Sequence, residues 1–138
     1  MISKNFRYSE FERSDTAKKY GIDNTIPEEL KPRVKALVDN VLQPLRDVWG
    51  AMPINSGYRC RELNEKVGGV ESSQHRKGEA CDVRCSNPLK LAQLAKDLGL
   101  PFDQIGLYPT FVHISHKYKG KQRGHIFYHK SYKGEKVK

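Results

Sequence analysis

Two histidines and one aspartate carry the most informative chemistry in this sequence. His75 and Asp82 lie seven residues apart in the polar stretch 73–82, and His113 lies in the apolar run 111–115. Two imidazoles and one carboxylate are a usual protein ligand set for a catalytic zinc ion, with the fourth position left for water. If these three side chains converge, the pattern predicts a zinc hydrolase.

Two of the three candidate ligands fall in segments that are typical of β-strands. Residues 79–85 and 111–115 alternate in character as strands do, so two adjacent strands would present Asp82 and His113 side by side. The first histidine falls in the loop before the earlier strand, where Gly78 permits a sharp turn back over the aspartate. The sequence therefore predicts a site on two adjacent strands, with the loop histidine turned back over it.

The elements that must support this sheet are helices early in the chain and strands late in it. A long amphipathic helix is expected from about residue 27, because apolar residues recur every three or four positions; Pro44 should kink it and Gly50 should end it. We expect shorter helices at 9–12, 14–21, 59–67 and 87–98, and further strands at 53–56, 104–107 and 125–128.

The order of these elements predicts the fold class. Helices first and strands last favour an α+β fold in which early helices pack on a small, mainly antiparallel sheet. The charged segment 117–124 should form a hairpin loop between the last two strands. The length suits a single domain over residues 1–138, with a basic tail from about residue 130 to 138.

The charge of the chain indicates an acidic partner. Lysine and arginine outnumber aspartate and glutamate by 25 to 16, for a formal net charge of +9. Such a charge attracts anionic wall polymers, nucleic acids and acidic membrane surfaces. Because no nucleic-acid recognition motif accompanies it, nucleic acid is the less favoured partner. Much of the excess lies late in the chain, in Lys117, Lys119, Lys121, Arg123, Lys130, Lys133, Lys136 and Lys138.

Cysteine usage and apolar patterning indicate the compartment. Cys60, Cys81 and Cys85 lack the spacing of a redox or zinc-ribbon site, so we expect reduced, buried thiols. No apolar run is long enough to span a membrane, and the first residues lack the apolar core of a secretory signal. We expect a monomer that is cytoplasmic as made, so any role outside the cell would need another exit route, such as lysis.

The motifs around the three candidate ligands resemble those of the M15 zinc peptidases. These include D-Ala-D-Ala carboxypeptidases and phage peptidoglycan endopeptidases, and they share a fold with the Hedgehog signalling domain. Residues 73–82 match the family pattern Ser-x-His-x-x-Gly-x-Ala-x-Asp, and residues 111–115 match its aromatic-Val-His-Ile-Ser strand. Residues 56–59 match a Ser-Gly-Tyr-Arg segment, and residues 102–104 a Phe-Asp-Gln segment.

The resemblance implies a function and a role for each matched residue. It implies a zinc ion held by His75, Asp82 and His113, and hydrolysis of peptidoglycan stem peptides near D-amino acids by zinc-activated water. Arg59 would bind a substrate carboxylate or carbonyl, a task that suits an always-charged guanidinium. Ser73 matches a position that hydrogen-bonds substrate in related dipeptidases.

The general base is the part of the site that the sequence leaves open. Related enzymes place a glutamate or aspartate shortly before the last zinc histidine, but residues 106–110 contain no carboxylate. His116 is one candidate, since a neutral imidazole titrates near working pH, although its odd offset from His113 points it to the other face of a regular strand. Asp103 and the hydroxyl of Tyr108 are the others.

Two functions from other classes stay open beside the peptidase. The missing carboxylate favours a catalytically weak or inactive zinc-stabilised module that binds cell wall or protein. A nucleic-acid binder rests only on the net charge of +9 and on the mixing of aromatic residues with late lysines, and a salt-sensitive gel shift would revive it.

Overall fold

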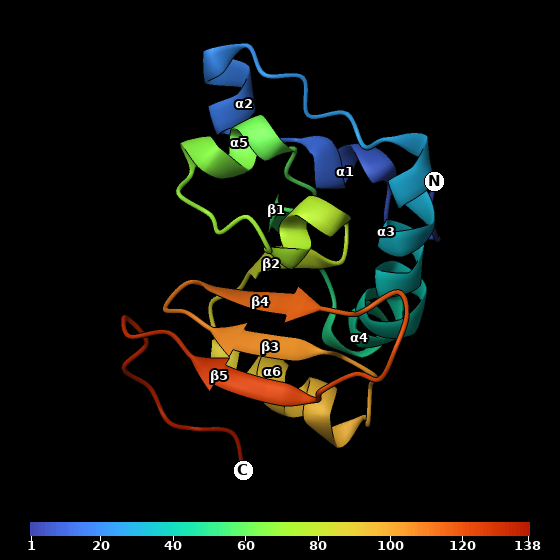
Figure 1. The fold of residues 1–138 in the computed structure, drawn as a ribbon. Coiled ribbons are helices and arrows are strands. Elements are labelled where there is room, and N and C mark those ends of the chain that lie inside the picture. The colour runs from blue at the N-terminus through green and yellow to red at the C-terminus, as the bar shows by residue number, and fades with distance from the viewer.

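The computed structural model describes residues 1–138, and a central sheet organises them (Figure 1). The elements follow in the order α1 (Tyr8–Glu12), α2 (Asp15–Tyr20), η1 (Glu28–Leu30), α3 (Lys31–Leu37), η2 (Val38–Leu42), α4 (Gln43–Trp49), β1 (Ile54–Ser56), α5 (Arg61–Lys66), η3 (Gln74–Lys77), β2 (Ala80–Arg84), α6 (Pro88–Asp97), β3 (Gln104–Leu107), β4 (Phe111–Ser115) and β5 (His125–Tyr128). The predicted α+β fold class is confirmed.

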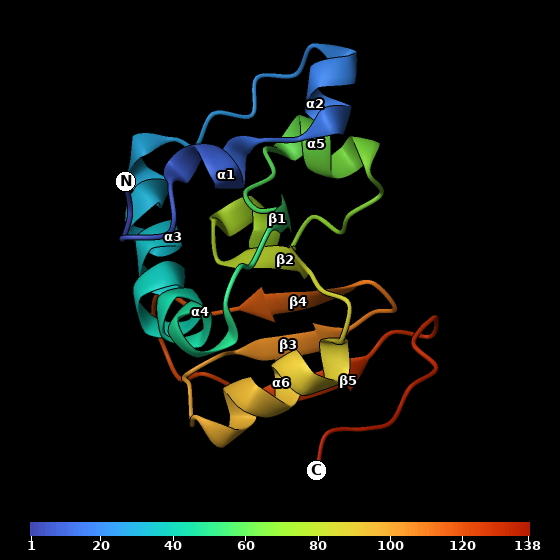
Figure 2. The same ribbon diagram turned by 180° about the vertical axis from the view of Figure 1, so that it is seen from behind.

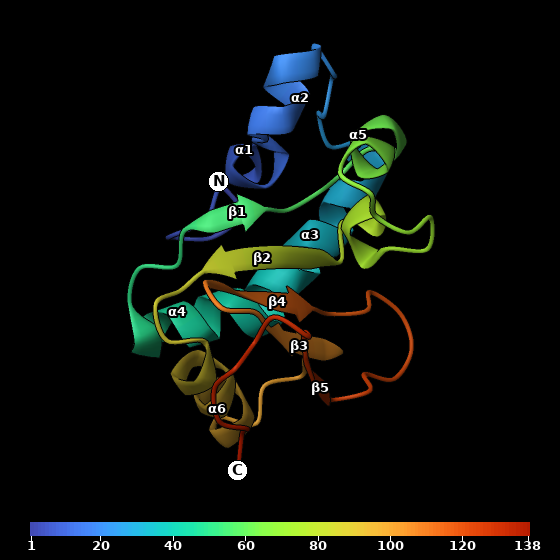
Figure 3. The same cartoon turned by 90° about the vertical axis from the view of Figure 1, so that its left-hand side faces the viewer.

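The five strands form one mixed sheet in the order β1-β2-β4-β3-β5. The pairs β1/β2, β2/β4 and β3/β4 are antiparallel, and β3/β5 is parallel. Figure 3 shows the strands in this order, with α4 and α6 to one side of them. The prediction of a small, mainly antiparallel sheet is therefore confirmed, with one parallel edge pair that the sequence did not indicate.

The expected hairpin between the last two strands is wrong. Both edges of β4 are already occupied, by β2 and β3, so β5 cannot pair with it. The chain instead crosses from β4 past the end of the sheet and adds β5 parallel to β3. The amide of His125 donates to the carbonyl of Asp103, which sets the start of this parallel pair. Segment 116–124 is therefore a crossover and not a hairpin loop.

The long predicted helix runs through η1, α3, η2 and α4, and it supplies much of the core. Proline has no N–H to donate, so the regular hydrogen-bond pattern of the helix is interrupted at Pro44. Just before it, the five-residue stretch η2 is π-helical, and the N–H of Gln43 donates to the carbonyl of Val38. Gly50, at φ 104°, ends the helix as predicted. The inward face is fully buried and consists of Val34, Leu37, Val38, Val41, Leu42 and Leu45.

The two faces of the sheet have different surroundings. Val112 and Ile114 of β4 are fully buried, on the face where α6 packs against β3 and β4 and also contacts α4. Figure 2 shows these helices in front of the strands. Because side chains alternate along a strand, His113 of β4 must face the opposite side, where it stays partly exposed. The helices therefore bury one face and leave the other to the candidate site.

Short helices at the N-terminus cover the β1 end of the sheet. In α1 the helix begins at Tyr8, one residue before the expected cap, because the Glu10 carboxylate accepts the amide of Arg7. In α2 the Ser14 hydroxyl accepts the amide of Ala17, as the sequence indicated. Figure 1 shows α1, α2 and α5 gathered above β1.

The thiols and the C-terminal residues complete the fold. All three cysteines are free; Cys81 and Cys85 are buried, and burial raises the pKa of both thiols, whereas Cys60 is half-buried. The last residues fold back along α6, where Gln93 accepts the amide of Lys138. None of the helices combines the length and the apolar character that crossing a membrane requires.

Candidate metal centre

Strand register brings Asp82 and His113 together at the middle of the sheet. They are direct partners in the antiparallel pair β2/β4. His113 Nδ1 lies 3.1 Å from Asp82 Oδ1, and His75 Nε2 lies 3.4 Å from the same oxygen. The two imidazole rings are 5.2 Å apart between centroids. The predicted convergence of these three side chains is confirmed; that they bind zinc stays a prediction.

His75 reaches this position because the turn η3 is held at both ends. The Ser73 hydroxyl accepts the amide of His75 and caps the turn, and Gly78 ends it in the left-handed region at φ 74°. The imidazole Nδ1 donates to the carbonyl of Gly57 at 2.7 Å, and the carbonyl of His75 accepts the amide of Arg59 at 3.0 Å. Ser73 therefore positions His75, whereas a contact with substrate stays a prediction.

The geometry of the three residues fits a tetrahedral cation. One ligand atom from each of His75, Asp82 and His113 can be chosen so that all lie within 4.8 Å of one another. In a tetrahedral zinc site with bonds of about 2.1 Å, ligand atoms lie about 3.4 Å apart. Since Nδ1 of His75 donates to Gly57, Nε2 is the nitrogen whose lone pair a neutral ring would offer to a metal. The donor set and its supporting contacts both suit zinc.

The electrostatics of Asp82 point to the same conclusion. Burial raises the pKa of this carboxyl, but hydrogen bonds and charge from His113 and His75 outweigh burial and hold it well below its usual range. The carboxylate is therefore ionised at any working pH. That lowering of the pKa requires protons and positive charge on the two imidazoles. With a divalent cation bound instead, the imidazoles would be neutral ligands, and the Asp82 carboxylate would supply the negative charge of the cluster.

Arg59 lies beside this cluster without a partner. Its Nε is buried and makes no hydrogen bond, and its guanidinium enters no ion pair. Burial lowers the pKa of this guanidinium, and the charges of Asp82 and Tyr108 partly offset the effect. Arg59 and Asp82 line one pocket of about 330 Å³, together with Asn55 and Ser56. A half-buried cation without an anion is a ready site for a ligand carboxylate or carbonyl.

The segment that presents Arg59 is fixed by a buried side chain that the sequence analysis missed. The Asn24 side chain donates to the carbonyl of Tyr58 at 2.9 Å and accepts the amide of Cys60 at 2.8 Å, so it brackets Arg59 from both sides. It also donates to the carbonyl of Glu12. An asparagine in a loop carries no local sign of such a role, because its partners are 12 to 36 residues away.

Aromatic rings form a wall near the cluster. Tyr108 stacks on Phe111 at 4.2 Å and on His129 at 4.5 Å between centroids, and Phe127 lies 6.0 Å from the ring of His113. Burial raises the pKa of the Tyr108 phenol, the charge of Asp82 raises it further, and Arg59 lowers it. Tyr108 is therefore a protonated hydroxyl that lies within the electrostatic reach of both residues, and it suits a hydrogen-bond donor better than a base.

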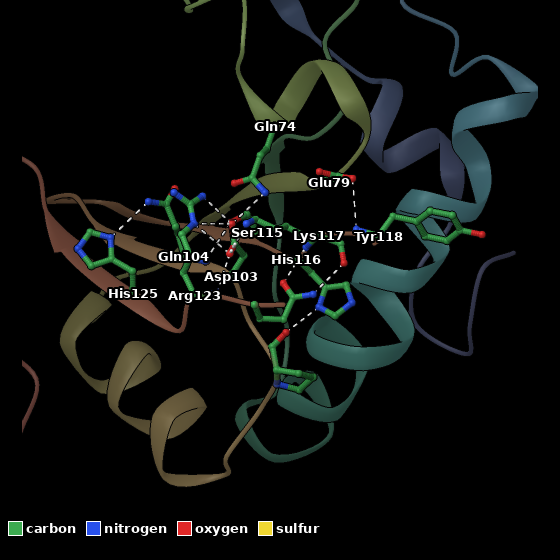
Figure 4. Close-up of polar contacts among 12 residues, drawn as sticks. Gln74, Glu79, Asp103, Gln104, Ser115, His116, Lys117, Tyr118, Arg123 and His125 are labelled. Atoms are coloured by element: carbon green, nitrogen blue, oxygen red, sulfur yellow. Dashed lines mark hydrogen bonds and ion pairs between the residues drawn. The ribbon is translucent and has the colours of Figure 1, made fainter. Parts of the chain in front are cut away.

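The other two candidates for the base are engaged elsewhere (Figure 4). His116 Nδ1 donates to the carbonyl of Pro101 at 2.6 Å, and the ring is buried outside the group of candidate ligands. Asp103 is fully buried and accepts hydrogen bonds from Arg123 and Gln74. The prediction that His116 is the base gains no support, and no further carboxylate belongs to the cluster.

Asp103 allows a prediction about acid stability. Burial raises the pKa of this carboxyl, but hydrogen bonds from Arg123 outweigh burial and lower it from 3.8 to about 2. A carboxyl whose pKa is lower in the folded state stabilises the fold at pH values above its unfolded pKa. About 2 kcal/mol of the free energy of unfolding should therefore be lost as pH falls from 4 to 2. Urea unfolding at several pH values measures this. Asp103→Asn should remove that part of the pH dependence, and an unchanged acid profile in the variant would contradict the assignment.

A second prediction concerns the close approach at Gly57. A Cβ added there would lie 2.7 Å from the Cα of Phe11, so the backbone of α1 would have to move. We expect Gly57→Ala to destabilise the protein by about 1–3 kcal/mol. It should also weaken metal binding, since the Gly57 carbonyl holds His75. Asn55→Ala, at an exposed position in the strand β1 just before Gly57, is the control, and equal unfolding midpoints for both variants would refute the clash.

Comparison with known proteins agrees with this geometry. The family model described as Peptidase M15 matches residues 4–115, which include the helices, the turn η3 and the strands that carry the cluster. A search of the curated proteins gives no match. The matched range covers most of the chain and all three candidate ligands, and so the chain belongs to the peptidase M15 family.

Proposed function

We propose that this protein is a zinc-dependent peptidase that hydrolyses peptidoglycan stem peptides near D-amino acids. Membership of a peptidase family supports the reaction class. The observation that carries the proposal is the cluster of His75, Asp82 and His113 with the unpaired guanidinium of Arg59 beside it. The same donor set holds iron in some oxygenases, and the family match favours zinc.

The residues of the chain divide the work between holding the metal and holding the substrate. His75, Asp82 and His113 would hold the zinc ion, which when bound supplies Lewis acidity and lowers the pKa of water. Arg59 would pair with a carboxylate or carbonyl of the peptide and orient the scissile bond over the cluster. The protonated hydroxyl of Tyr108 would donate a hydrogen bond to the carbonyl oxygen as negative charge develops there.

The pocket beside Arg59 is suited to a small polar part of a peptide. Its volume is about 330 Å³, and only Leu63 and Val67 among its nine lining residues are apolar. A pocket of this kind selects short, polar side chains or a free carboxylate in preference to large apolar residues. Stem peptides, which carry carboxylates and small D-amino acids, fit this description.

The experiment is to incubate zinc-loaded protein with purified muropeptides and to follow the products by mass spectrometry. Release of a terminal D-amino acid would define a carboxypeptidase, and internal cleavage an endopeptidase. His113→Ala, which removes a candidate ligand, is the control for contaminating hydrolases. Equal amounts of product from the wild type and from His113→Ala would refute the proposal.

A second function is favoured by one observation, the lack of any carboxylate in the cluster besides Asp82. A peptidase without a general base loses a factor of about 10² to 10⁴ in rate. We propose, as the alternative, a zinc-stabilised module that binds cell wall or protein and turns over slowly or not at all. Zinc-loaded protein that binds muropeptides in a calorimeter and leaves them intact would establish it.

A further inference from the structure

A second pocket shares the turn that carries His75. Its volume is about 520 Å³, larger than the pocket beside Arg59. Gln74, Arg76 and Lys77 of η3 line it, whereas the His75 ring turns toward Asp82. The other walls come from η1 and α3, from Glu79 just before β2 and from the crossover 116–124. We call it the basic pocket.

Cations dominate the lining of the basic pocket. Glu79 is the only acidic residue among its ten lining residues and Leu30 the only apolar one. Six cationic side chains come from separate segments of the chain and meet there: Arg33, Arg76, Lys77, Lys117, Lys119 and Arg123. A concave surface lined by one sign of charge focuses the field and concentrates ions of the opposite sign.

Two buried carboxylates fix two of the three arginines of the basic pocket in place. Glu79 is 5% exposed and accepts Arg33 Nη1 at 2.6 Å, and it also accepts the amide of Tyr118. Asp103 accepts Arg123 Nη2 at 2.6 Å, and Figure 4 shows Gln74 of the turn pointing toward this pair. Arg33 keeps its Nε and Nη2 groups without a partner, and Arg123, whose Nε and Nη2 bind Asp103, keeps its Nη1, so N–H donors in preset positions remain for a ligand.

The remaining cations of the basic pocket are poorly compensated. Lys77 and Lys119 are exposed and have no carboxylate within 4.0 Å. Lys117 lies 3.9 Å from Asp103, which Arg123 already occupies. Arg76 lies 4.0 Å from the exposed Glu71. The pocket therefore carries an excess of positive charge that its own acids do not neutralise.

These observations select the kind of ligand. We propose that the basic pocket binds a phosphodiester polymer whose phosphates are joined by small polyol units. Arginine forks match phosphate oxygens, and the volume admits more than one anionic group. The lining holds one apolar residue and no aromatic ring. The Tyr118 ring beside it already stacks under the Arg33 guanidinium, 5.4 Å from the ring centroid, so the pocket offers little free surface on which nucleobases could stack. This binding site is separate from the metal centre, and it goes beyond the proposed peptidase activity.

Calorimetric titration of the full chain with a short poly(glycerol phosphate) tests the proposal. The variant Lys77→Gln/Lys119→Gln removes two exposed pocket cations that hold no carboxylate, and Lys130→Gln/Lys133→Gln removes the same charge from the C-terminal residues. We expect the pocket pair to weaken binding at least tenfold at low salt and the control pair less than twofold. In the pocket pair, the plot of log binding constant against log salt concentration should become less steep by about 1.4, since each lost phosphate contact contributes about 0.7.

Three outcomes would overturn the proposal. Equal losses in the two variant pairs would mean that only net charge matters. Inorganic phosphate that displaces the polymer at equal phosphate concentration would mean a site for free phosphate. Oligothymidylate that binds more tightly than the polymer, and loses affinity in the pocket pair, would mean a nucleic-acid site. Zinc content should be equal in all variants, so this test is independent of the metal centre.

Discussion

Asp82→Ala is expected to abolish metal binding and peptidase activity together. Its carboxylate lies between both imidazoles and supplies the only negative charge of the cluster, so two neutral histidines alone should not retain zinc. Elemental analysis of gently purified protein should give about one zinc per chain in the wild type and none in the variant. Hydrolysis of muropeptides should fall to background.

Thermal unfolding gives the same prediction a second readout. Free zinc at a concentration about a thousand times the Kd raises the free energy of unfolding by about 4 kcal/mol. A chelator should therefore lower the wild-type Tm by roughly 15 °C and leave that of Asp82→Ala unchanged. Asp39→Ala, which removes an exposed carboxylate on the long helix, is the matched control and should behave as wild type. A wild-type Tm that is indifferent to chelator would count against the metal centre.

Arg59→Ala is expected to keep the metal and lose most of the activity. No group of the protein pairs with this guanidinium, so its removal should leave the cluster and the fold intact. Because Arg59 would orient the scissile bond over the cluster, its loss should cost on the order of 10² in kcat/KM. Steady-state kinetics and zinc content should be measured on the same preparation.

Neighbouring substitutions separate the role of Arg59 from a general loss of charge. Arg61→Ala removes an exposed arginine that pairs only with Glu65 at 3.4 Å, and it should leave kcat/KM unchanged. Arg59→Lys should restore only part of the activity, because an ammonium lacks the planar fork. Zinc loss in Arg59→Ala, or equal activity in Arg59→Ala and Arg61→Ala, would show that Arg59 does not handle substrate.

The outcome of the muropeptide experiment bears on the missing base. Fast turnover would require a proton acceptor, and the structure leaves no carboxylate near the cluster except Asp82. Tyr108→Phe would then test the donor role of the phenol, since the ring stack with Phe111 and His129 survives the change. A rate that falls with the KM unchanged would support a role in the transition state.

Local patterns were sufficient to predict most of the elements. Strands 104–107, 111–115 and 125–128 have the predicted bounds, and the helix through Pro44 ends at Gly50 as expected. Alternation along β2 and β4 also predicted that Asp82 and His113 would face each other, and the register confirms it. These features depend on side-chain periodicity and on proline and glycine geometry, which neighbouring residues determine.

Contacts between distant segments could not be predicted in the same way. The crossover of 116–124 depends on Asp103, which captures Arg123 and the amide of His125. The tilt of His75 depends on the carbonyl of Gly57, and the position of Arg59 depends on Asn24. A backbone carbonyl is present in every residue, and so its use as a partner leaves no trace in composition or spacing.

The types and spacing of His75, Asp82 and His113 determine which metal chemistry this chain can support, because ligand identity is a property of the residues themselves. The tertiary structure determines which groups remain free to act. It engages His116 and Asp103 in contacts with the crossover and the loop before β3, and it leaves Arg59 without a partner. Availability depends on pairing across the fold, which forms only when segments far apart in the chain meet.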